Sequence, residues 1–259
     1  MSEPEFCRVE RDGHLLQVTI SRPEVMNAIH PPASFELSRV FDSFESDPEL
    51  WVAIVTGAGD KAFCAGNDLK YQAAGNKLEW PASGFGGLTS RFDGRKPVIA
   101  AVNGLAMGGG FEIVLACDIA VASERAVFAL PEPRVGLAAL AGGLHRLPRQ
   151  IGHKPAMGML LTGRRVDAAE ALRLGIVNEV VGAGELLDAA RRWAAAILEC
   201  SPVSVRATRQ VALEGLAHAS LEDAMSARYE AISELVRSDD FREGPLAFAQ
   251  KRKPSWKGR

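Results

Sequence analysis

Cysteine is scarce in this sequence, and its four copies lie far apart. Cys7, Cys64, Cys117 and Cys200 are more than fifty residues from one another and form no C-x-x-C pair. The five histidines also lack the spacing that metal ligands show. This pattern excludes a disulfide scaffold and a zinc module, so we expect reduced thiols, a cytoplasmic location and no metal.

The sequence also lacks a strong charge of either sign and an uninterrupted apolar run. Its formal net charge of −2 argues against the basic face that nucleic-acid-binding proteins need. Residues 98–122 are mostly apolar, but Glu112 and Asp118 interrupt them, and a charge near the bilayer centre costs at least about 2.5 kcal/mol. The acidic N-terminal stretch lacks the apolar core of a signal peptide. We therefore expect no nucleic-acid partner and no membrane association.

Strand and helix patterns alternate along most of the chain. With 259 residues, of which 47% are hydrophobic, the chain can bury a large core. Helical patterns dominate from Ser201 onward. Residues 14–21 alternate in the manner of a strand with one buried face, and 51–58 and 97–102 are apolar runs typical of strands. The sequence thus predicts an α/β core over residues 1–195 and a helical C-terminal lobe over residues 196–259.

Residues 73–94 are rich in glycine and are predicted to form a long surface loop. Loops of this length usually have a function. Trp80, Phe85 and Phe92 of this segment either pack the loop or face a quaternary ammonium group through cation–π contacts.

A dinucleotide-binding motif is suggested by GAGDKA at 57–62, which follows a predicted strand and matches G-x-G-x-x-G/A. A Rossmann unit needs a helix directly after this motif, so that the helix N-terminus receives the pyrophosphate. The next residues, FCAGND, are typical of turns instead. An NAD-dependent oxidoreductase therefore stays a minor alternative.

Three consecutive glycines, Gly108 to Gly110, precede Phe111 and Glu112 at a predicted helix start. Glycines allow the backbone to approach a ligand closely, and the first N–H groups of a helix are unpaired within it. Such N–H groups suit a developing oxyanion, whereas tight packing of the helix on a sheet is the alternative. Glu112 lies within an apolar run, where burial raises a carboxyl pKa, so it is a candidate acid or base. A capping glutamate that faces water at the helix N-terminus is the alternative.

A second carboxylate of interest is Glu132 in LPEPRVGL. Pro131 and Pro133 restrict the backbone on both sides, and Pro133 favours an extended conformation at Glu132. A surface turn is the simpler alternative. Two positioned carboxylates beside a set of N–H donors can divide the work of base and acid around one water molecule.

These residues, with several longer blocks, resemble the crotonase or enoyl-CoA hydratase/isomerase superfamily. The similarity covers nearly the whole chain and rests on blocks in the usual order, RPEVMNAI, KAFCAGNDLK, KPVIAAVNGLAMGGGFEIVLACDI, FALPEPRVGL and LTGRRVDAAEALRLGIVNEVV. Two further stretches, GFGGLTSRFDGRKPVIAAVNG and EGPLAFAQKRKPSWKGR, are similar to its carnitinyl-CoA dehydratase branch. The resemblance implies a spiral of ββα units and a helical lobe that forms trimers or hexamers.

The resemblance also implies roles for single residues. The backbone N–H groups of Asn67 and Gly109 correspond to the oxyanion hole of the thioester, and Glu112 and Glu132 to the two catalytic carboxylates. Many relatives have alanine where this chain has Asn67. Because the hole uses only the N–H, its role survives, but the carboxamide changes the acyl pocket. The loop that lies along coenzyme A maps to Ala65, Asp68, Leu69 and Lys70.

The expected activity is reversible hydration of an α,β-unsaturated acyl-CoA or dehydration of a 3-hydroxyacyl-CoA, which makes the protein a hydro-lyase. Coenzyme A is then part of the substrate, and no separate cofactor is expected. An enoyl-CoA isomerase of the same superfamily is the nearest alternative. An acyl-CoA-binding protein without catalysis is less favoured, because both carboxylates are present.

Overall fold

The strands of the computed structural model form two sheets. The structure describes residues 4–259. Within this range the strands are β1 (Cys7–Asp12), β2 (Leu15–Ile20), β3 (Val52–Gly57), β4 (Ala62–Cys64), β5 (Val98–Val102), β6 (Leu105–Met107), β7 (Ile119–Ser123), β8 (Val127–Ala129), β9 (Val166–Asp167) and β10 (Glu179–Val181). The larger sheet has the order β1-β2-β3-β5-β7-β10, and the smaller has the order β4-β6-β8-β9.

Most neighbouring strands are parallel, as expected when helices connect them. In the larger sheet only the β1–β2 pair is antiparallel, and in the smaller sheet only β8–β9. The short strands β4, β6 and β8 each follow a strand of the larger sheet, so the chain repeatedly visits one sheet and then the other. Strand β6 of the smaller sheet ends directly before helix α3 (Gly109–Ala116).

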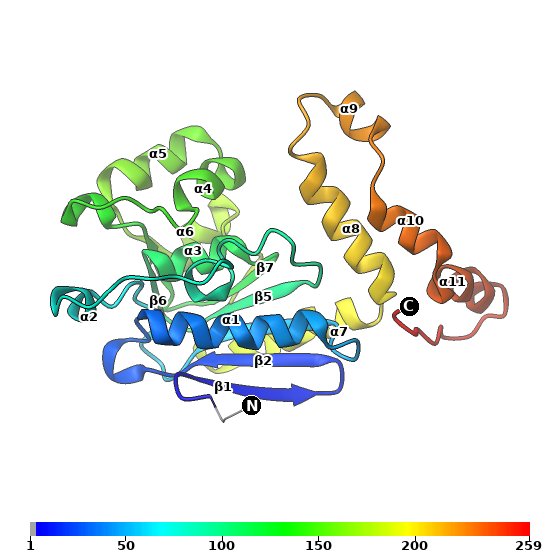
Figure 1. Cartoon of the computed structure of the whole chain (residues 1–259), viewed down its shortest axis with the longest axis horizontal. Helices are drawn as coiled ribbons and strands as arrows, with labels where there is room; N and C mark the ends of the chain where they lie inside the picture. The colour runs from blue at the N-terminus through cyan, green and yellow to red at the C-terminus, as the bar shows by residue number, and fades with distance from the viewer. Residues whose placement is uncertain (1–3) are drawn as a thin grey trace.

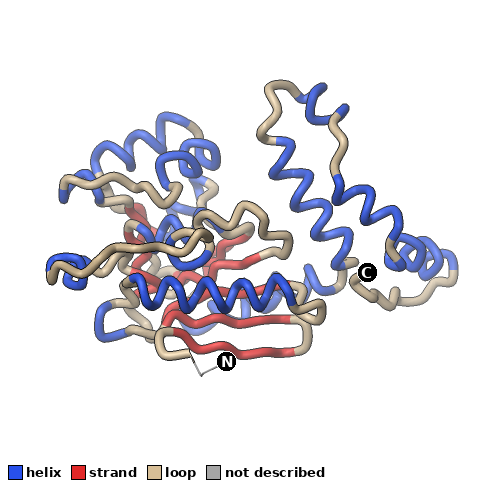
Figure 2. The backbone as a smooth tube through the Cα atoms, in the orientation of Figure 1, coloured by secondary structure: helices blue, strands red, loops and turns tan. Residues whose placement is uncertain are grey.

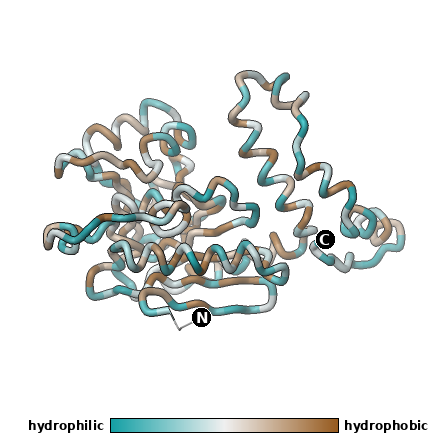
Figure 3. Tube along the Cα trace, viewed as in Figure 1, coloured by the Kyte–Doolittle hydropathy of each residue, from teal (hydrophilic) through white to brown (hydrophobic). Residues whose placement is uncertain are grey.

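Both faces of the larger sheet are buried at its central strands β3 and β5, which explains their continuous apolar runs. In β3 and β5, alternate side chains point to opposite faces. Ile54 and Ile99 pack under helix α7 (Leu186–Leu198), whereas Val55 and Val98 belong to the main core on the other face. Figure 3 shows brown, hydrophobic segments along the inner strands of the body. The central sheet therefore separates two hydrophobic cores.

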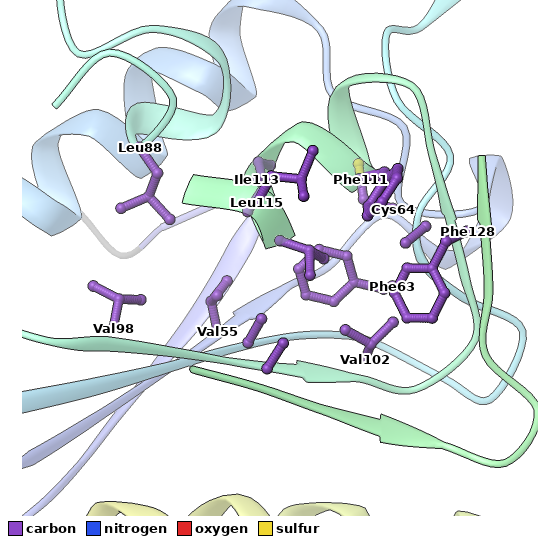
Figure 4. Close-up of a cluster of buried hydrophobic side chains, with 14 of the residues drawn as sticks. Val55, Phe63, Cys64, Leu88, Val98, Val102, Phe111, Ile113, Leu115 and Phe128 are labelled. Atoms are coloured by element: carbon purple, nitrogen blue, oxygen red, sulfur yellow. The ribbon is translucent and has the colours of Figure 1, made fainter. Parts of the chain in front are cut away.

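The main core surrounds helix α3 (Gly109–Ala116). Phe111 and Ile113 of this helix are fully buried, and Figure 4 shows them among Phe63, Val102 and Phe128. The rings of Phe111 and Phe128 have centroids 5.4 Å apart. Aromatic pairs at this distance stabilise a core beyond the area that they bury. This packing fixes the first turn of α3, which carries Glu112.

Helices cover the sheets and continue into a separate lobe (Figures 1 and 2). On the body these are α1 (Pro31–Ser46), α2 (Leu69–Ala73), α3, α4 (Gly143–Ile151), α5 (His153–Thr162), α6 (Ala168–Leu174) and α7. The lobe contains α8 (Pro202–Gly215), α9 (Leu221–Ser226), α10 (Glu230–Arg237) and α11 (Asp239–Ala249), and in Figure 1 it projects away from the sheets. Four single 3-10 turns of the described chain are η1 (Pro23–Val25), η2 (Phe85–Gly87), η3 (Glu132–Val135) and η4 (Ala183–Glu185).

The chain after α11 folds back onto the lobe. The buried carboxylate of Asp240 accepts hydrogen bonds from the Ser201 hydroxyl at 2.9 Å and from the Lys257 N–H at 2.7 Å. The indole of Trp256 donates to the Glu199 carbonyl at 2.9 Å. Asp240 thus connects the start of α8 with the last residues of the chain.

The structure confirms the α/β architecture and corrects the prediction for residues 73–94. Residues 73–94 do not form a surface loop throughout, because Phe85 and Leu88 are buried against α1 and α3. The segment around Gly86 is close enough to Ile113 that a Cβ there would collide with its side chain. Within residues 4–259, no helix is both long enough and apolar enough to span a membrane.

Candidate active site

The predicted site residues meet at a cavity of about 570 Å³ between α3, η3 and the 73–94 segment. Its volume is in the usual range for small-molecule sites. The wall contains both candidate carboxylates, both candidate oxyanion donors and two of the four residues assigned to coenzyme A. These are Ala65, Asn67, Leu69, Gly109, Glu112 and Glu132.

At each of the three consecutive glycines, a side chain would collide with a different neighbour. A Cβ on Gly108, whose φ is +53°, would lie 2.9 Å from Glu132 Oε1. A Cβ on Gly109 would lie 2.6 Å from the ring of Phe85, and one on Gly110 would overlap the carbonyl oxygen of Cys64. Close packing therefore explains Gly110, while Gly108 and Gly109 leave the helix N-terminus open to the cavity.

Glu112 lies in the first turn of α3 and is 3% exposed. Its Oε1 accepts a hydrogen bond from the Gly143 N–H at 2.8 Å, at the start of α4. Burial raises the pKa of Glu112 to about 7, and the nearby Glu132 adds to this rise, although the bond from Gly143 opposes it. A carboxyl group with a pKa near neutrality can both accept and donate a proton under physiological conditions.

Glu132 is the first residue of the turn η3, so the predicted extended conformation is wrong. Proline is tolerated in the first turn of a helix, because the N–H that it lacks has no partner there. Pro133 therefore permits the 3-10 turn, which the Leu137 N–H closes on the Glu132 carbonyl at 2.9 Å. Burial raises the pKa of the Glu132 carboxyl, and its Oε2 has no hydrogen-bond partner in the described chain. This oxygen is buried, and the Glu132 side chain forms part of the cavity wall.

The N–H groups of Asn67 and Gly109 are unpaired in the part of the chain that the structure describes. The two segments lie side by side, since a Cβ on Gly66 would be 3.2 Å from the Gly109 nitrogen. Gly109 is the first residue of α3, where the helix leaves N–H groups free and adds the positive end of its dipole. The two N–H groups and the helix dipole can together stabilise a ligand oxygen that gains negative charge during a reaction.

The residues assigned to coenzyme A divide into two groups. Ala65 and Leu69 line the cavity, whereas Asp68 and Lys70 do not. The Asp68 carboxylate pairs with Arg22 at 3.0 Å and accepts the Tyr71 N–H at the start of α2, and Lys70 is exposed. Coenzyme A binding by these residues stays a prediction.

The aromatic residues of the 73–94 segment also separate. Trp80 and Phe85 line the cavity with ring centroids 5.1 Å apart. Phe92 is 83% exposed outside the cavity, where the Arg146 guanidinium lies 5.8 Å from its ring. The prediction that all three could face one ligand is therefore wrong for Phe92.

Two residues of the site were missed from sequence. The Gly143 N–H binds the Glu112 carboxylate, although the two residues are 31 positions apart in the chain. In the sequence, only the pair of glycines at a predicted helix start points to this residue. Thr89, which lines the cavity, is 2% exposed, and its buried hydroxyl has no partner in the described chain. A lone threonine in a loop has no pattern that could reveal it.

The segment 57–62 does not form a dinucleotide site of the Rossmann type. After β3 the chain makes a turn and enters β4, so no helix N-terminus follows the glycines. Across residues 4–259, no cluster of three or more His, Cys, Asp or Glu side chains is arranged to hold a metal ion.

The raised pKa of Glu112 predicts a stability effect. Its ordinary pKa is 4.5, so between pH 4.5 and about 7 the folded protein keeps a proton that the unfolded chain has released. Stability contributed by this group is therefore lost as the pH rises through that window. We expect Glu112→Gln to match the wild type near pH 4.5 and to exceed it above pH 7 by about 3 kcal/mol per subunit. Unfolding by urea at several pH values measures this, with the exposed Glu214→Gln as control. A pH-independent difference would contradict it.

Sequence comparison places the whole chain in one family. Residues 10–259 match the family model described as enoyl-CoA hydratase/isomerase. The carnitinyl-CoA dehydratase of Proteus mirabilis is 45% identical over 253 residues, which cover 95% of this chain and 96% of that protein. The protein of the same name from Escherichia coli K12 is 44% identical over 261 residues, covering 98% and 99%.

Comparison with solved structures identifies the same family. An enoyl-CoA hydratase from Mycobacterium tuberculosis superposes with a TM-score of 0.92 at 38% identity and covers 99% of this chain and 100% of that one. A carnitinyl-CoA hydratase from Mycobacterium avium has a TM-score of 0.78 at 42% identity, with coverage of 98% and 99%. The predicted crotonase-type fold is confirmed, and the chain belongs to the enoyl-CoA hydratase/isomerase family.

Proposed function

We propose that this protein is a hydro-lyase that adds water to an α,β-unsaturated acyl-CoA and removes it from a 3-hydroxyacyl-CoA. The observation that carries the proposal is the meeting of Glu112, Glu132 and two unpaired N–H groups at one cavity. The names of the relatives, carnitinyl-CoA dehydratase and enoyl-CoA hydratase, support the same chemistry.

In the proposed mechanism the thioester oxygen accepts hydrogen bonds from the Asn67 and Gly109 N–H groups. One water molecule lies between Glu112 and Glu132. Its oxygen bonds to C3 while one carboxylate takes its proton, and the other carboxyl delivers a proton to C2. The two N–H groups stabilise the enolate that forms between these steps. In dehydration the same transfers run backwards, so each glutamate exchanges its role.

No separate cofactor is proposed, because the addition of water changes no overall oxidation state. The proton transfers need only groups with pKa values close to the working pH. Glu112, whose pKa is about 7, meets that requirement. Coenzyme A enters as part of the substrate, with Ala65, Asp68, Leu69 and Lys70 as the proposed contacts.

The reaction is tested by mixing the purified protein with crotonyl-CoA in isotopically labelled water. A hydratase removes the conjugated enoyl absorbance and places labelled oxygen in the product. An isomerase shifts a double bond without taking up this oxygen, and an acyl-CoA-binding protein leaves the absorbance unchanged. Crotonobetainyl-CoA in a parallel assay tests the acyl group that the name carnitinyl-CoA dehydratase indicates.

We propose that the helical lobe forms trimers or hexamers, because it exposes many apolar side chains that water disfavours. The exposed set on α8 to α11 and their connections consists of Leu213, Leu216, Leu221, Met225, Ile232, Val236, Phe241, Leu246 and Phe248. Light scattering at micromolar concentration is expected to give three or six times the chain mass of 27.7 kDa. A mass equal to one chain would contradict the assembly.

A further inference from the structure

The block RPEVMNAI at 22–29 contacts the segment that carries one of the proposed oxyanion donors. Its first and last residues, Arg22 and Ile29, both bind the segment 66–68, whose middle residue is Asn67. All residues of the block are described by the structure, and none of them lines the cavity. An effect of Arg22 on the reaction is therefore transmitted through the segment 66–68.

Backbone pairing determines the direction of the Asn67 N–H. Asn67 and Ile29 form an isolated parallel bridge. The Ile29 N–H donates to the Gly66 carbonyl at 2.8 Å, and the Asp68 N–H donates to the Ile29 carbonyl at 3.1 Å. Because the backbone groups on both sides of Asn67 face Ile29, the Asn67 N–H itself faces away from Ile29. This direction leaves it without a partner in the described chain.

The same segment packs closely against the start of α3. The φ of Gly66 is +92°, and a Cβ there would lie 2.7 Å from the Met107 carbonyl oxygen and 3.2 Å from the Gly109 nitrogen. The two proposed oxyanion donors thus belong to segments in contact. A shift of the segment that carries Asn67 changes the distance between these donors.

A largely buried ion pair connects the two bridged segments. The Arg22 guanidinium donates to Asp68 Oδ2 at 3.0 Å and also to the Ala28 carbonyl. The side chains of Arg22 and Asp68 are 14% and 9% exposed. Charge-assisted hydrogen bonds from a planar guanidinium restrict the geometry of their acceptors, and salt screens such a sheltered pair only weakly. One guanidinium therefore connects both segments, each at a residue next to the bridged pair.

Arg22 is itself fixed to the body of the protein. Its N–H donates to Asn27 Oδ1 at 3.0 Å. The Asn27 carboxamide is fully buried and donates to the carbonyls of Ala58 and Ala62 at 2.9 and 2.8 Å. The backbone that carries the guanidinium is therefore anchored between β3 and β4.

We infer that Arg22 is a positioning residue of the oxyanion hole, which holds the Asn67 N–H toward the thioester through its ion pair with Asp68. This inference rests on the proposed hydratase function. A misplacement of about 1 Å can cost about 10²-fold in rate, and the complete loss of one oxyanion donor costs about 10²–10³-fold in kcat. The effect of Arg22 is expected within these limits.

Arg22→Met is expected to lower kcat for hydration of crotonyl-CoA by about 10- to 100-fold with little change in KM, because a displaced donor mainly weakens the transition state. Arg22→Lys keeps the charge but not the planar fork, so its kcat is expected between those of Arg22→Met and the wild type. Light scattering and circular dichroism establish that the variants fold.

Lys96→Met is the matched control. Lys96 is also a buried cation that donates to backbone carbonyls, those of Phe44 and Asp47 at 2.6 Å, but it lies at the end of α1 and outside the cavity. Its substitution is expected to lower stability and to leave kcat unchanged. If folded Arg22→Met has the same kcat as this control, the inference is overturned.

The double variant Arg22→Met/Asp68→Asn separates positioning from the effect of a charge left without its partner. Arg22→Met alone strands the Asp68 carboxylate in a buried place, which can disturb the fold by itself. The double variant removes that charge but does not restore the ion pair. A kcat that stays low supports positioning by the pair, whereas a return to the wild-type kcat overturns it.

Infrared spectroscopy of bound butanoyl-CoA with an isotopically labelled thioester carbonyl separates this inference from the proposed function, because the saturated analogue cannot be hydrated. Hydrogen bonds from the oxyanion donors lower the carbonyl stretching frequency. Arg22→Met is expected to lose part of this shift, and Lys96→Met to keep it. If Arg22→Met fails to fold, the double variant, which leaves no stranded carboxylate, takes its place.

The outcomes of the infrared measurement are distinct. A shift that Arg22→Met loses in a protein without hydration activity overturns the hydratase function and supports the positioning role. An equal shift in the wild type and in folded Arg22→Met overturns the positioning role, whether or not crotonyl-CoA is hydrated. The absence of any shift in the wild type overturns the oxyanion hole and the positioning role together.

Discussion

Glu112→Gln and Glu132→Gln are each expected to lower kcat for hydration by about 10²–10⁴-fold, the usual scale for a positioned acid or base. Glutamine keeps the size of the side chain and can still accept the Gly143 N–H at position 112, but it cannot exchange a proton. Acyl-CoA affinity is expected to change little. The double variant is expected to lose little more than the weaker single variant, because groups that act as a unit are strongly non-additive.

Glu45→Gln provides the matched control for these substitutions. Glu45 is a half-buried glutamate that also accepts a backbone hydrogen bond, from the Arg95 N–H at 3.2 Å, but it lies outside the cavity. The kcat of the Glu45→Gln variant is expected to remain within about threefold of the wild-type value. If Glu112→Gln or Glu132→Gln behaves like this control with its best substrate, the two carboxylates do not share the water.

Gly109→Pro is expected to lower kcat by about 10²–10³-fold relative to Gly109→Ala, the cost of one lost oxyanion donor. Proline suits the first position of a helix, and there it removes an N–H that has no partner in the helix. Both substitutions add a Cβ against the ring of Phe85, and proline also adds Cγ and Cδ, with Cδ in the place of the amide hydrogen. The difference between the two variants therefore measures the loss of the N–H together with the bulk of the ring that replaces it.

The comparison requires that both Gly109 variants assemble as the wild type does, which light scattering and circular dichroism establish. Equal kcat values in the two folded variants would show that the Gly109 N–H does not stabilise the transition state. In that case the Asn67 N–H and the dipole of α3 would have to stabilise the oxyanion without it.

The sequence predicts the fold best where burial leaves a periodic pattern. Strand β2 was recognised from alternation typical of a strand with one buried face, and β3 and β5 from short apolar runs. Strand β1, with the sequence CRVERD, was missed, since it is an exposed edge strand and pairs with β2 through its backbone. The three-residue strand β6 is too short to show any period.

The site could be predicted only where local chemistry was unusual. Glu112 in an apolar helix turn and Glu132 between two prolines both stand out in the sequence itself. Gly143 contributes through a hydrogen bond to Glu112, which is 31 positions away, and Thr89 lines the cavity; nothing in their sequence neighbours indicates either role. The conformation of Glu132 was predicted wrongly, because a position at a helix start outweighed the usual effect of the following proline.

The separation of the two hydrophobic cores by the larger sheet has a consequence for engineering this scaffold. The core under α7 contributes no side chain to the cavity, so substitutions there and in the acyl pocket are expected to combine additively. Most changes that remodel a pocket reduce stability. Stabilising substitutions can therefore be sought in the core under α7 before the pocket is randomised, so that a library of acyl-pocket variants begins with a reserve of stability.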